Sequence, residues 1–280
     1  MPLRGPVPPD ISGYLATPTA AAIEFQRLFS ARSPRVIFDI GACEGEDSIR
    51  FTRLFPLARI HAFEPLPANQ ALVRANFERF AAANASLECL ALSDAAGEAV
   101  FHVSSGQPPN LFAGENWNYG NKSSSLLAPA KEEAMHGWIE FKEDITVPTD
   151  TIDSFCARHG IGRIDLVHMD VQGAEMMVLR GAARMLPRIT GVWLEVSATE
   201  LYRGQALDRE IARFMRARGF TLAHAVSLGN SSGEGDHFYV NLRRLRTWPY
   251  LTAKRASSLL ARLRFWAGRA RNRVLHRSSP

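Results

Sequence analysis

Two apolar segments near the start of the chain, each closely associated with a carboxylate, constrain the fold most strongly. The first segment, residues 36–40, contains Asp39 and leads into a turn with Gly41 and Gly45. The second segment, residues 59–63, ends directly before Glu64. An apolar run that passes through glycines into the start of a helix is typical of a buried parallel strand. In such sheets a carboxylate at a strand end accepts hydrogen bonds from the hydroxyls of a ribose. The two segments therefore predict a site for a nucleoside-bearing cofactor, with glycines that let the backbone approach it.

The turn after the first segment carries three further acids, which narrow the choice of cofactor. Its glycines lack the G-x-G-x-x-G spacing that places a pyrophosphate at a helix N-terminus. Glu44, Glu46 and Asp47 would repel a diphosphate, which disfavours an NAD-dependent enzyme. S-adenosylmethionine carries a sulfonium and an ammonium beside its adenosine, so it fits an acidic turn better. The alternative is that these acids only complement the dipole of a helix.

Length and composition indicate one large domain with appendages. A chain of 280 residues, 46% of them hydrophobic, can bury one substantial α/β core. Cys43, Cys89 and Cys156 are odd in number and lack metal-site spacing, which suits a reducing compartment. Residues 1–10 show no signal peptide, and no apolar run is long enough to span a bilayer. We therefore expect a cytoplasmic protein.

Strand-like and helix-like segments alternate along most of the chain. This order predicts an α/β fold with a mostly parallel sheet, helices on both faces and an antiparallel final strand. The predicted strands are 36–40, 59–63, 87–92, 98–103, 164–169, 192–196, 220–226 and 237–242. The predicted helices start at Pro67, cover 151–159, follow the stripe Val178, Ala182 and Met185, and run from Leu207 to Gly219.

Two further features locate a site in this fold. Ligands bind at the carboxyl ends of parallel strands, so the acids that end the apolar runs are expected at one rim: Asp39, Glu64, Asp94, Asp170 and Glu195. Residues 104–147 lack the periodic pattern and are interpreted as an insertion. Because this segment contains aromatic side chains, it is a candidate lid over the substrate: Phe112, Trp117, Tyr119 and Trp138.

Several blocks of sequence resemble the FkbM family of S-adenosylmethionine-dependent methyltransferases. The most specific is the string IDLVHMDVQGAE at 164–175, followed by VLRGA at 178–182. The other blocks occur in the family's order at 39–42, 63–65, 91–94 and 151–153. The similarity covers approximately residues 36–241. It implies a class I methyltransferase (Rossmann-like) fold and O-methylation of sugars, glycans, polyketide-type natural products or other small acceptors.

The resemblance also implies roles for individual residues. The methionine and ribose parts of the cofactor would lie against Asp39, Gly41, Ala42 and Gly45. Glu64 would bind the ribose diol, and Ser93 and Asp94 would lie at the adenine. The chain departs from the family at two positions: Cys43 stands where Asn is frequent, and His168 where Lys is frequent. A histidine there makes the local charge dependent on pH.

Methyl transfer to a hydroxyl needs a group that accepts the proton of the acceptor. Asp170, at the end of a central strand, is the first candidate for this base, and Glu195 and His168 follow, with His237 and Glu175 behind them. The alternatives are that Asp170 caps a helix beginning near Gln172 and that His168 is a core residue; Glu175 could simply support the rim.

A divalent cation between Asp170 and Glu195 stays open as an alternative, because carboxylates suit Mg²⁺. No dedicated metal motif is present, however, and a metal site is not predicted.

The C-terminal segment, residues 243–280, differs from the rest in charge. It contains eleven Lys and Arg and no acid, whereas residues 1–242 hold 22 basic and 28 acidic side chains. An apolar stripe that includes Trp266 is bordered by arginines, which is typical of a helix lying in a membrane interface. This pattern predicts binding to an anionic inner membrane face, near a lipid-linked glycan acceptor. The alternatives are packing on the acidic body or on a partner, and, in third place, RNA binding.

The predicted organisation is an N-terminal extension (1–33), a methyltransferase domain (34–242) with the insertion at 104–147, and the basic tail (243–280). The rival to an enzyme is a methyltransferase-like scaffold that has lost turnover and acts through this tail.

Overall fold

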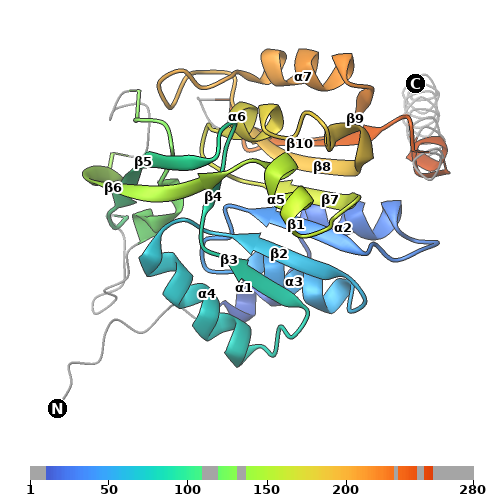
Figure 1. Cartoon of the computed structure of the whole chain (residues 1–280), viewed down its shortest axis with the longest axis horizontal. Coiled ribbons are helices and arrows are strands. Elements are labelled where there is room, and N and C mark those ends of the chain that lie inside the picture. Colours follow the sequence, from blue (N-terminus) through green and yellow to red (C-terminus); the bar gives the residue numbers. More distant parts are fainter. Residues whose placement is uncertain (1–10, 109–118, 131–136, 230–232, 245–248, 255–280) are drawn as a thin grey trace, which may run out of the picture.

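A seven-stranded sheet forms the centre of the molecule in the computed structural model, which describes residues 11–108, 119–130, 137–229, 233–244 and 249–254 (Figure 1). Its strand order is β3-β2-β1-β7-β8-β10-β9. Neighbouring strands from β3 to β8 pair in parallel, whereas β10 is antiparallel to both of its neighbours. The strands are β1 Val36–Ile40, β2 Arg59–Phe63, β3 Ala85–Glu88, β7 Ile164–Met169, β8 Ile189–Val196, β9 Phe220–Ser227 and β10 Gly235–Asn241. The predicted mostly parallel sheet with an antiparallel final strand is confirmed.

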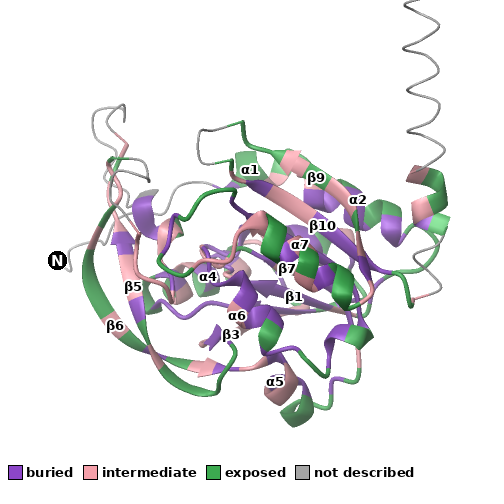
Figure 2. Ribbon diagram, turned by 90° about the horizontal axis from the view of Figure 1, so that it is seen from above, coloured by how far each residue is buried: buried purple, intermediate pink, exposed green. Residues whose placement is uncertain are grey.

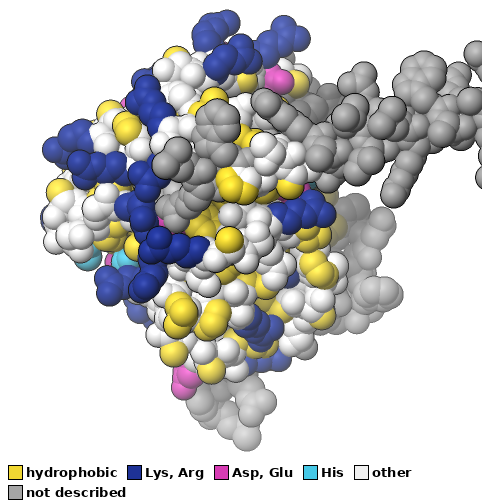
Figure 3. Space-filling model, turned by 90° about the vertical axis from the view of Figure 1, so that its right-hand side faces the viewer, with side chains coloured by type: hydrophobic (Ala, Val, Ile, Leu, Met, Phe, Trp, Pro, Cys, Tyr) yellow, Lys and Arg dark blue, Asp and Glu magenta, His cyan; other side chains and the backbone are white. Residues whose placement is uncertain are grey.

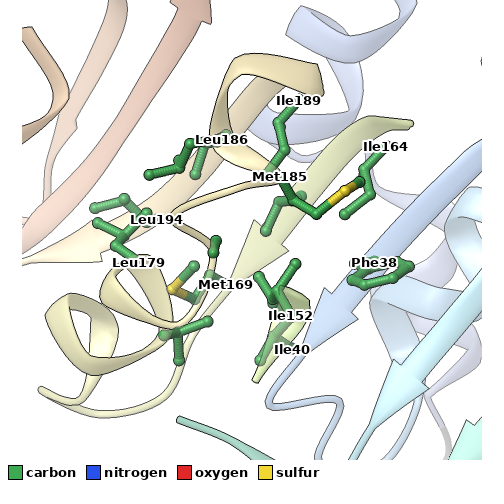
Figure 4. Packing of buried hydrophobic residues seen from close by; sticks show 14 of the residues in the cluster. Phe38, Ile40, Ile152, Ile164, Met169, Leu179, Met185, Leu186, Ile189 and Leu194 are labelled. Atoms are coloured by element: carbon green, nitrogen blue, oxygen red, sulfur yellow. The ribbon is translucent and has the colours of Figure 1, made fainter. Parts of the chain in front are cut away.

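Helices cover both faces of this sheet, because successive strand residues point to opposite sides. On β1, Phe38 and Ile40 belong to one buried cluster with Leu179, and Ile37 belongs to a second cluster with Phe51. Figure 4 shows the first cluster between β1, β7 and α6. The helices are α1 Ser12–Ala16, α2 Ala20–Leu28, α3 Glu46–Leu54, α4 Pro67–Arg79, α5 Ile152–Arg158, α6 Glu175–Arg180 and α7 Asp208–Ala217.

The predicted strand 87–92 is wrong in one respect, because it is two strands in two sheets. β3 ends at Glu88, and the N–H of Leu90 bonds back to the carbonyl of Glu88 at 2.9 Å. The chain thereby leaves the main sheet and forms β4 (Ala91–Leu92) in a second sheet of order β4-β6-β5. β5 is Gly97–Ser105 and β6 is Glu140–Asp150.

The insertion is more regular than the sequence predicted. Its last part, 140–147, belongs to β6 and pairs antiparallel with β5, and its middle part forms a 3₁₀ helix, η1, at Tyr119–Ser123. β6 escaped prediction because most of its side chains are exposed, in contrast to the buried strands β1 and β7 (Figure 2). Phe112 and Trp117 lie outside the described residues.

Helix α6 is shorter than predicted. It ends at Arg180, and Gly181 follows at a place where a Cβ would lie 2.0 Å from the carbonyl oxygen of Ser93. Ala182 and Met185 are buried in the turns after the helix rather than on it. The tight packing of this turn on the 91–94 segment therefore ends the helix earlier than the apolar spacing suggests.

The described parts of both flanking segments pack against the sheet. Phe25 of α2 is fully buried, with its ring centroid 5.4 Å from those of Phe51 and Phe238. Residues 249–254 are helical, and Tyr250 joins the same cluster. The Tyr250 hydroxyl donates to the buried carboxylate of Glu24. The division at residues 33 and 242 stays a prediction, but these flanks share a core with the residues between them.

Within the described ranges, no helix combines the length and the apolar character that crossing a membrane requires.

Replacing Phe25 by Ala tests whether α2 is an integral part of the domain. We expect the free energy of unfolding to fall by about 3–5 kcal/mol, because a fully buried ring is lost from a packed cluster. Ile23→Ala on the same helix is the matched control, since Ile23 is 38% exposed, and it should cost under about 1 kcal/mol. Urea unfolding of both variants makes the comparison, and an equally small loss in both would contradict an integral α2.

Candidate active site

The carboxyl ends of the parallel strands form one rim, as expected, and bring most of the predicted acids to it. Asp39 lies in β1 directly beside His168 of β7, Glu64 follows β2 and Asp170 follows β7. Glu195, near the end of β8, joins the rim through a hydrogen bond from Gln172 at 3.0 Å. The roles of these residues stay predictions.

A first cavity of about 520 Å³, including its open mouth, lies between this rim and the second sheet. Glu64 lies in its wall and is buried. Its two carboxylate oxygens accept the backbone N–H groups of Cys43 and Leu66, each at 2.8 Å. Burial nevertheless raises the pKa of Glu64 to about 8. Much of the remaining wall is apolar and includes Phe63, Leu90, Leu92, Phe101 and Leu126.

The cavity also contains a buried acceptor without a partner among the described residues. Asn121 of η1 donates its side-chain N–H groups to Glu44 and Asn69, at 3.3 and 3.2 Å. Its Oδ1 atom is buried and accepts no hydrogen bond. Because such an atom is costly to leave unpaired, it favours a ligand with a hydrogen-bond donor at this wall.

A second cavity, of about 660 Å³ with its open part, adjoins the first. The two share the residues Gly41, Cys43, Lys122 and Asp170 in their walls. The second is lined in addition by Tyr14, Asp39, Ala42, Glu46, Asp47 and His168. A ligand with a nucleoside and a charged chain could therefore place its apolar part in the first cavity and the chain in the second.

The glycines of the acidic turn are required by the packing of the protein, whatever their contact with a cofactor. Gly41 has a φ of 83°, and a Cβ there would lie 1.8 Å from the carbonyl oxygen of Asp170. Gly45 has a φ of 80°, and its Cβ would meet Phe77 of α4 at 2.9 Å. Both residues must be glycine because of the left-handed backbone and close packing of the protein on itself. The predicted contact of these glycines with the cofactor stays a prediction.

Asp39 and His168 form an ion pair at the base of the second cavity. His168 Nδ1 lies 2.9 Å from one oxygen of Asp39, and the hydroxyl of Ser48 donates to the other. Burial lowers the pKa of His168, but the bond to Asp39 and the neighbouring carboxylates outweigh it and raise the pKa to about 9. His168 is therefore a cation at neutral pH. An imidazolium cannot accept a proton, so the raised pKa of His168 disfavours this residue as the base.

Gln172 connects the two remaining candidates for the base. Its side-chain N–H groups donate to Asp170 at 2.6 Å and to Glu195 at 3.0 Å. Its Oε1 lies 3.0 Å from the hydroxyl of Tyr202. Asp170 opens to the cavities while protein surrounds its other sides; this desolvation raises its pKa, whereas the Gln172 amide and His168 lower it. Burial and the charge of Asp170 raise the pKa of Glu195.

The turn that carries Gln172 is held in an unusual conformation. Gln172 has a φ of 53° and the following Gly173 a φ of 93°. Glu175 accepts the N–H groups of Val171 and Gly173 at 3.3 Å, which is the supporting role considered from the sequence. The proposed capping role of Asp170 is wrong, because α6 begins at Glu175.

Ser93 and Asp94, like Gly45 and Glu195, are predicted site residues that line neither cavity. Ser93 is buried and its N–H bonds to the carbonyl of Asp150 at 2.8 Å, while Asp94 is exposed. The first cavity is lined instead by the preceding residues, Leu90, Ala91 and Leu92. A contact from Ser93 or Asp94 to the adenine stays a prediction.

Comparison with known proteins identifies this arrangement. A family model described as the methyltransferase FkbM domain matches residues 39–222. The chain belongs to the FkbM methyltransferase family. It is an S-adenosylmethionine-dependent methyltransferase, and the resemblance stated from the sequence is confirmed.

Two curated proteins illustrate the relationship. The 2-O-methyltransferase NoeI of Sinorhizobium fredii (strain NBRC 101917 / NGR234) is 35% identical over 176 residues, which cover 63% of this chain and 69% of NoeI. The 31-O-demethyl-FK506 methyltransferase FkbM of Streptomyces tacrolimicus is 29% identical over 202 residues, covering 67% and 73%. Among solved structures, a precorrin-6y C5,15-methyltransferase from Geobacter metallireducens GS-15 aligns over 79% of this chain and 86% of its own, with 16% identity and a TM-score of 0.42.

The residues of this FkbM methyltransferase fit its cofactor. Glu64 and the unpaired Asn121 oxygen offer acceptors in the first cavity, whose apolar wall suits an adenosine. The acids of the second cavity suit the sulfonium and ammonium groups. The described residues do not offer a comparable site for a metal ion, because no three of their His, Cys, Asp or Glu side chains converge.

Sequence reasoning missed the residues that reach this site from elsewhere in the chain. Asn121 and Lys122 come from the insertion, Tyr14 from α1, and Tyr202 from the loop before α7. No motif of the sequence marks these residues, because their places in the site depend on contacts with distant segments. Gln172 was within the quoted signature, but its bridging position depends on a left-handed backbone that the sequence does not reveal.

The raised pKa of His168 predicts a pH-dependent contribution to stability. The pKa of His168 is about 9 in the folded protein, against 6.5 for an ordinary histidine. Its charge therefore stabilises the folded state fully below pH 6.5, and this stabilisation is lost as the pH rises through about 9. The deficit in unfolding free energy of His168→Gln relative to the wild type should therefore be largest near pH 6 and shrink toward pH 9. Urea unfolding at several pH values measures it. A deficit that does not change with pH would contradict the ion pair.

Proposed function

We propose that this enzyme transfers a methyl group from S-adenosylmethionine to a hydroxyl of a sugar, glycan or natural-product acceptor. The observation that carries the proposal is Asp170, which opens onto both cavities and is free of a capping role. The relatives support the choice of oxygen as acceptor atom, since both are named as O-methyltransferases or for an O-demethyl substrate.

The chain's own residues have two tasks in such a reaction. Bound S-adenosylmethionine supplies a methyl group on a positively charged sulfur. The protein must hold the acceptor oxygen in line with that methyl group, which accounts for much of the acceleration, and must accept the hydroxyl proton, which contributes about 10² to 10⁴-fold. Asp170 is the proposed base. The Gln172 amide stabilises its ionised form and orients it toward the cavities, and Glu195 is the second carboxylate of the pair.

The rival function, a scaffold without turnover, makes the opposite prediction for a direct assay. A scaffold binds the cofactor but transfers no label to any acceptor. The described site favours an enzyme, because its candidate base is exposed to the cavity rather than engaged in supporting the fold.

Asp170→Asn tests the base. Transfer of tritium from labelled S-adenosylmethionine to a panel of glycans and polyketides should fall by about 10² to 10⁴-fold, because the amide cannot accept the proton, while calorimetry should show nearly unchanged cofactor affinity. Asp144→Asn, on the exposed β6, is the matched control and should transfer at the wild-type rate. Full activity of Asp170→Asn would show that another group is the base.

We also propose that the protein associates with anionic membranes through its basic C-terminal tail. The described helix of the tail, residues 249–254, lies on the side of the molecule where the parallel strands begin (Figure 1). Figure 3 shows Lys and Arg side chains gathered over this side. A cavity there is lined by Arg35, Arg59 and Arg163, which lie at the starts of β1, β2 and β7. Each basic residue near an anionic leaflet adds about 1 kcal/mol, so the body would reinforce the tail.

Liposome flotation tests this association, and the fold dictates the truncation. A chain that ends after Lys254 keeps Tyr250 in the core, whereas one that ends at Leu242 would not. We expect the full chain to float with vesicles containing phosphatidylserine and the truncated chain to float about tenfold less. Vesicles of phosphatidylcholine alone are the control. Equal flotation of the two chains would refute a membrane role for residues 255–280. Capture of the full chain, but not the truncated chain, by RNA without flotation of either would favour nucleic acid.

A further inference from the structure

The second cavity poses a charge problem that the acidic turn alone does not solve. Four of its lining side chains are acids: Asp39, Glu46, Asp47 and Asp170. These suit the positive groups of S-adenosylmethionine, but the amino-acid end of the cofactor also carries a carboxylate. A carboxylate placed among acids in a partly desolvated cavity is repelled unless a cation faces it.

Two basic side chains line this cavity among the described residues, Lys122 and His168. The side chain of His168 is 14% exposed, and its Nδ1 atom is paired with Asp39. Lys122, by contrast, is about half exposed and has three N–H donors, one of which pairs with Glu46. Lys122 also lies in the wall that the two cavities share. Among the described residues His168 keeps one N–H, on Nε2 of a mostly buried ring, whereas Lys122 keeps two donors on a more exposed ammonium and is therefore the better placed cation for a ligand.

Lys122 is held in place by the structure around it rather than by the ion pair alone. The carbonyl of Gly120 and the N–H of Ser123, on either side of Lys122, both bond to the hydroxyl of Ser104 on β5. The carbonyl of Ser123 lies 2.8 Å from the hydroxyl of Tyr202. The described part of the insertion is therefore a bonded wall of the site. A cation on such a wall is preorganised for a ligand, which reduces the entropy lost on binding.

From this geometry we infer that Lys122 is the receptor for the α-carboxylate of S-adenosylmethionine. Glu46 orients the ammonium of Lys122, and the free donors face the cavity. The pairing raises the pKa of Lys122 against the opposing effect of its partial burial, so the side chain stays charged at any physiological pH. The inference rests on the proposed function of the site and extends it to the recognition of one chemical group by one residue.

Calorimetry with two ligands tests the inference without an acceptor. S-adenosylhomocysteine carries the α-carboxylate, and its decarboxylated analogue, 5′-S-(3-aminopropyl)thioadenosine, lacks it but keeps the ammonium. Lys122→Gln should weaken binding of the first by roughly tenfold to a hundredfold, the range for a hydrogen bond to a charged group. Binding of the analogue should be unchanged or tighter, because its ammonium then faces acids without the competing lysine. Lys122→Arg should retain most of the affinity.

Controls separate this outcome from trivial ones. Lys142→Gln, on β6 and 72% exposed, should leave both affinities unchanged. Equal weakening of both ligands by Lys122→Gln, or unchanged affinity for S-adenosylhomocysteine, would overturn the inference, as would selective loss in His168→Gln with none in Lys122→Gln. If the wild type bound neither ligand, the cofactor assignment itself would fail, which is a different result from any of these.

Discussion

Burial of several carboxylates together at the carboxyl ends of the parallel strands, with their mutual repulsion, is the constraint that shapes this site. The parallel topology brings Asp39, Glu64 and Asp170 to one rim, and each must be stabilised in a different way. Asp39 is paired with a histidine cation, Glu64 accepts two backbone N–H groups, and Asp170 shares the amide of Gln172 with a neighbouring carboxylate. For Glu64, burial outweighs these contacts and raises its pKa to about 8. Most polar contacts of these three carboxylates therefore serve to stabilise acids that the fold places close together.

The sequence predicted the parts of the fold that depend on local periodicity. β1, β2 and β7 were predicted with their observed limits, since their residues are buried on both faces of a sheet and form continuous apolar runs. β6 was missed because it is largely exposed, and the break between β3 and β4 was missed because one apolar run spans both. In these cases the pairing partner, and not the local pattern, determines the structure.

The same distinction holds for the site and for the limits of the domain. The acids at the strand ends could be predicted, because their position follows from the topology. Lys122 could not, since its contact with Glu46 joins residues that are 76 positions apart. Likewise, the role of Tyr250 depends on a carboxylate 226 positions earlier. The predicted domain limit at residue 242 rests on the change from acidic to basic composition. The buried core nevertheless includes Tyr250, beyond that limit.

The charge distribution of the body constrains where an acceptor can approach. Acids line the cavities at the carboxyl ends of the strands, while arginines line a cavity at their amino ends. A five-residue strand such as β1 spans about 17 Å, so the two edges are separated by at least this length of sheet. If the arginine-rich edge faces an anionic membrane, the cavities lie at the edge of the sheet that is farther from it. An acceptor attached to a lipid would then have to present its hydroxyl well above the headgroups, which a long glycan can do and a short lipid-linked sugar cannot.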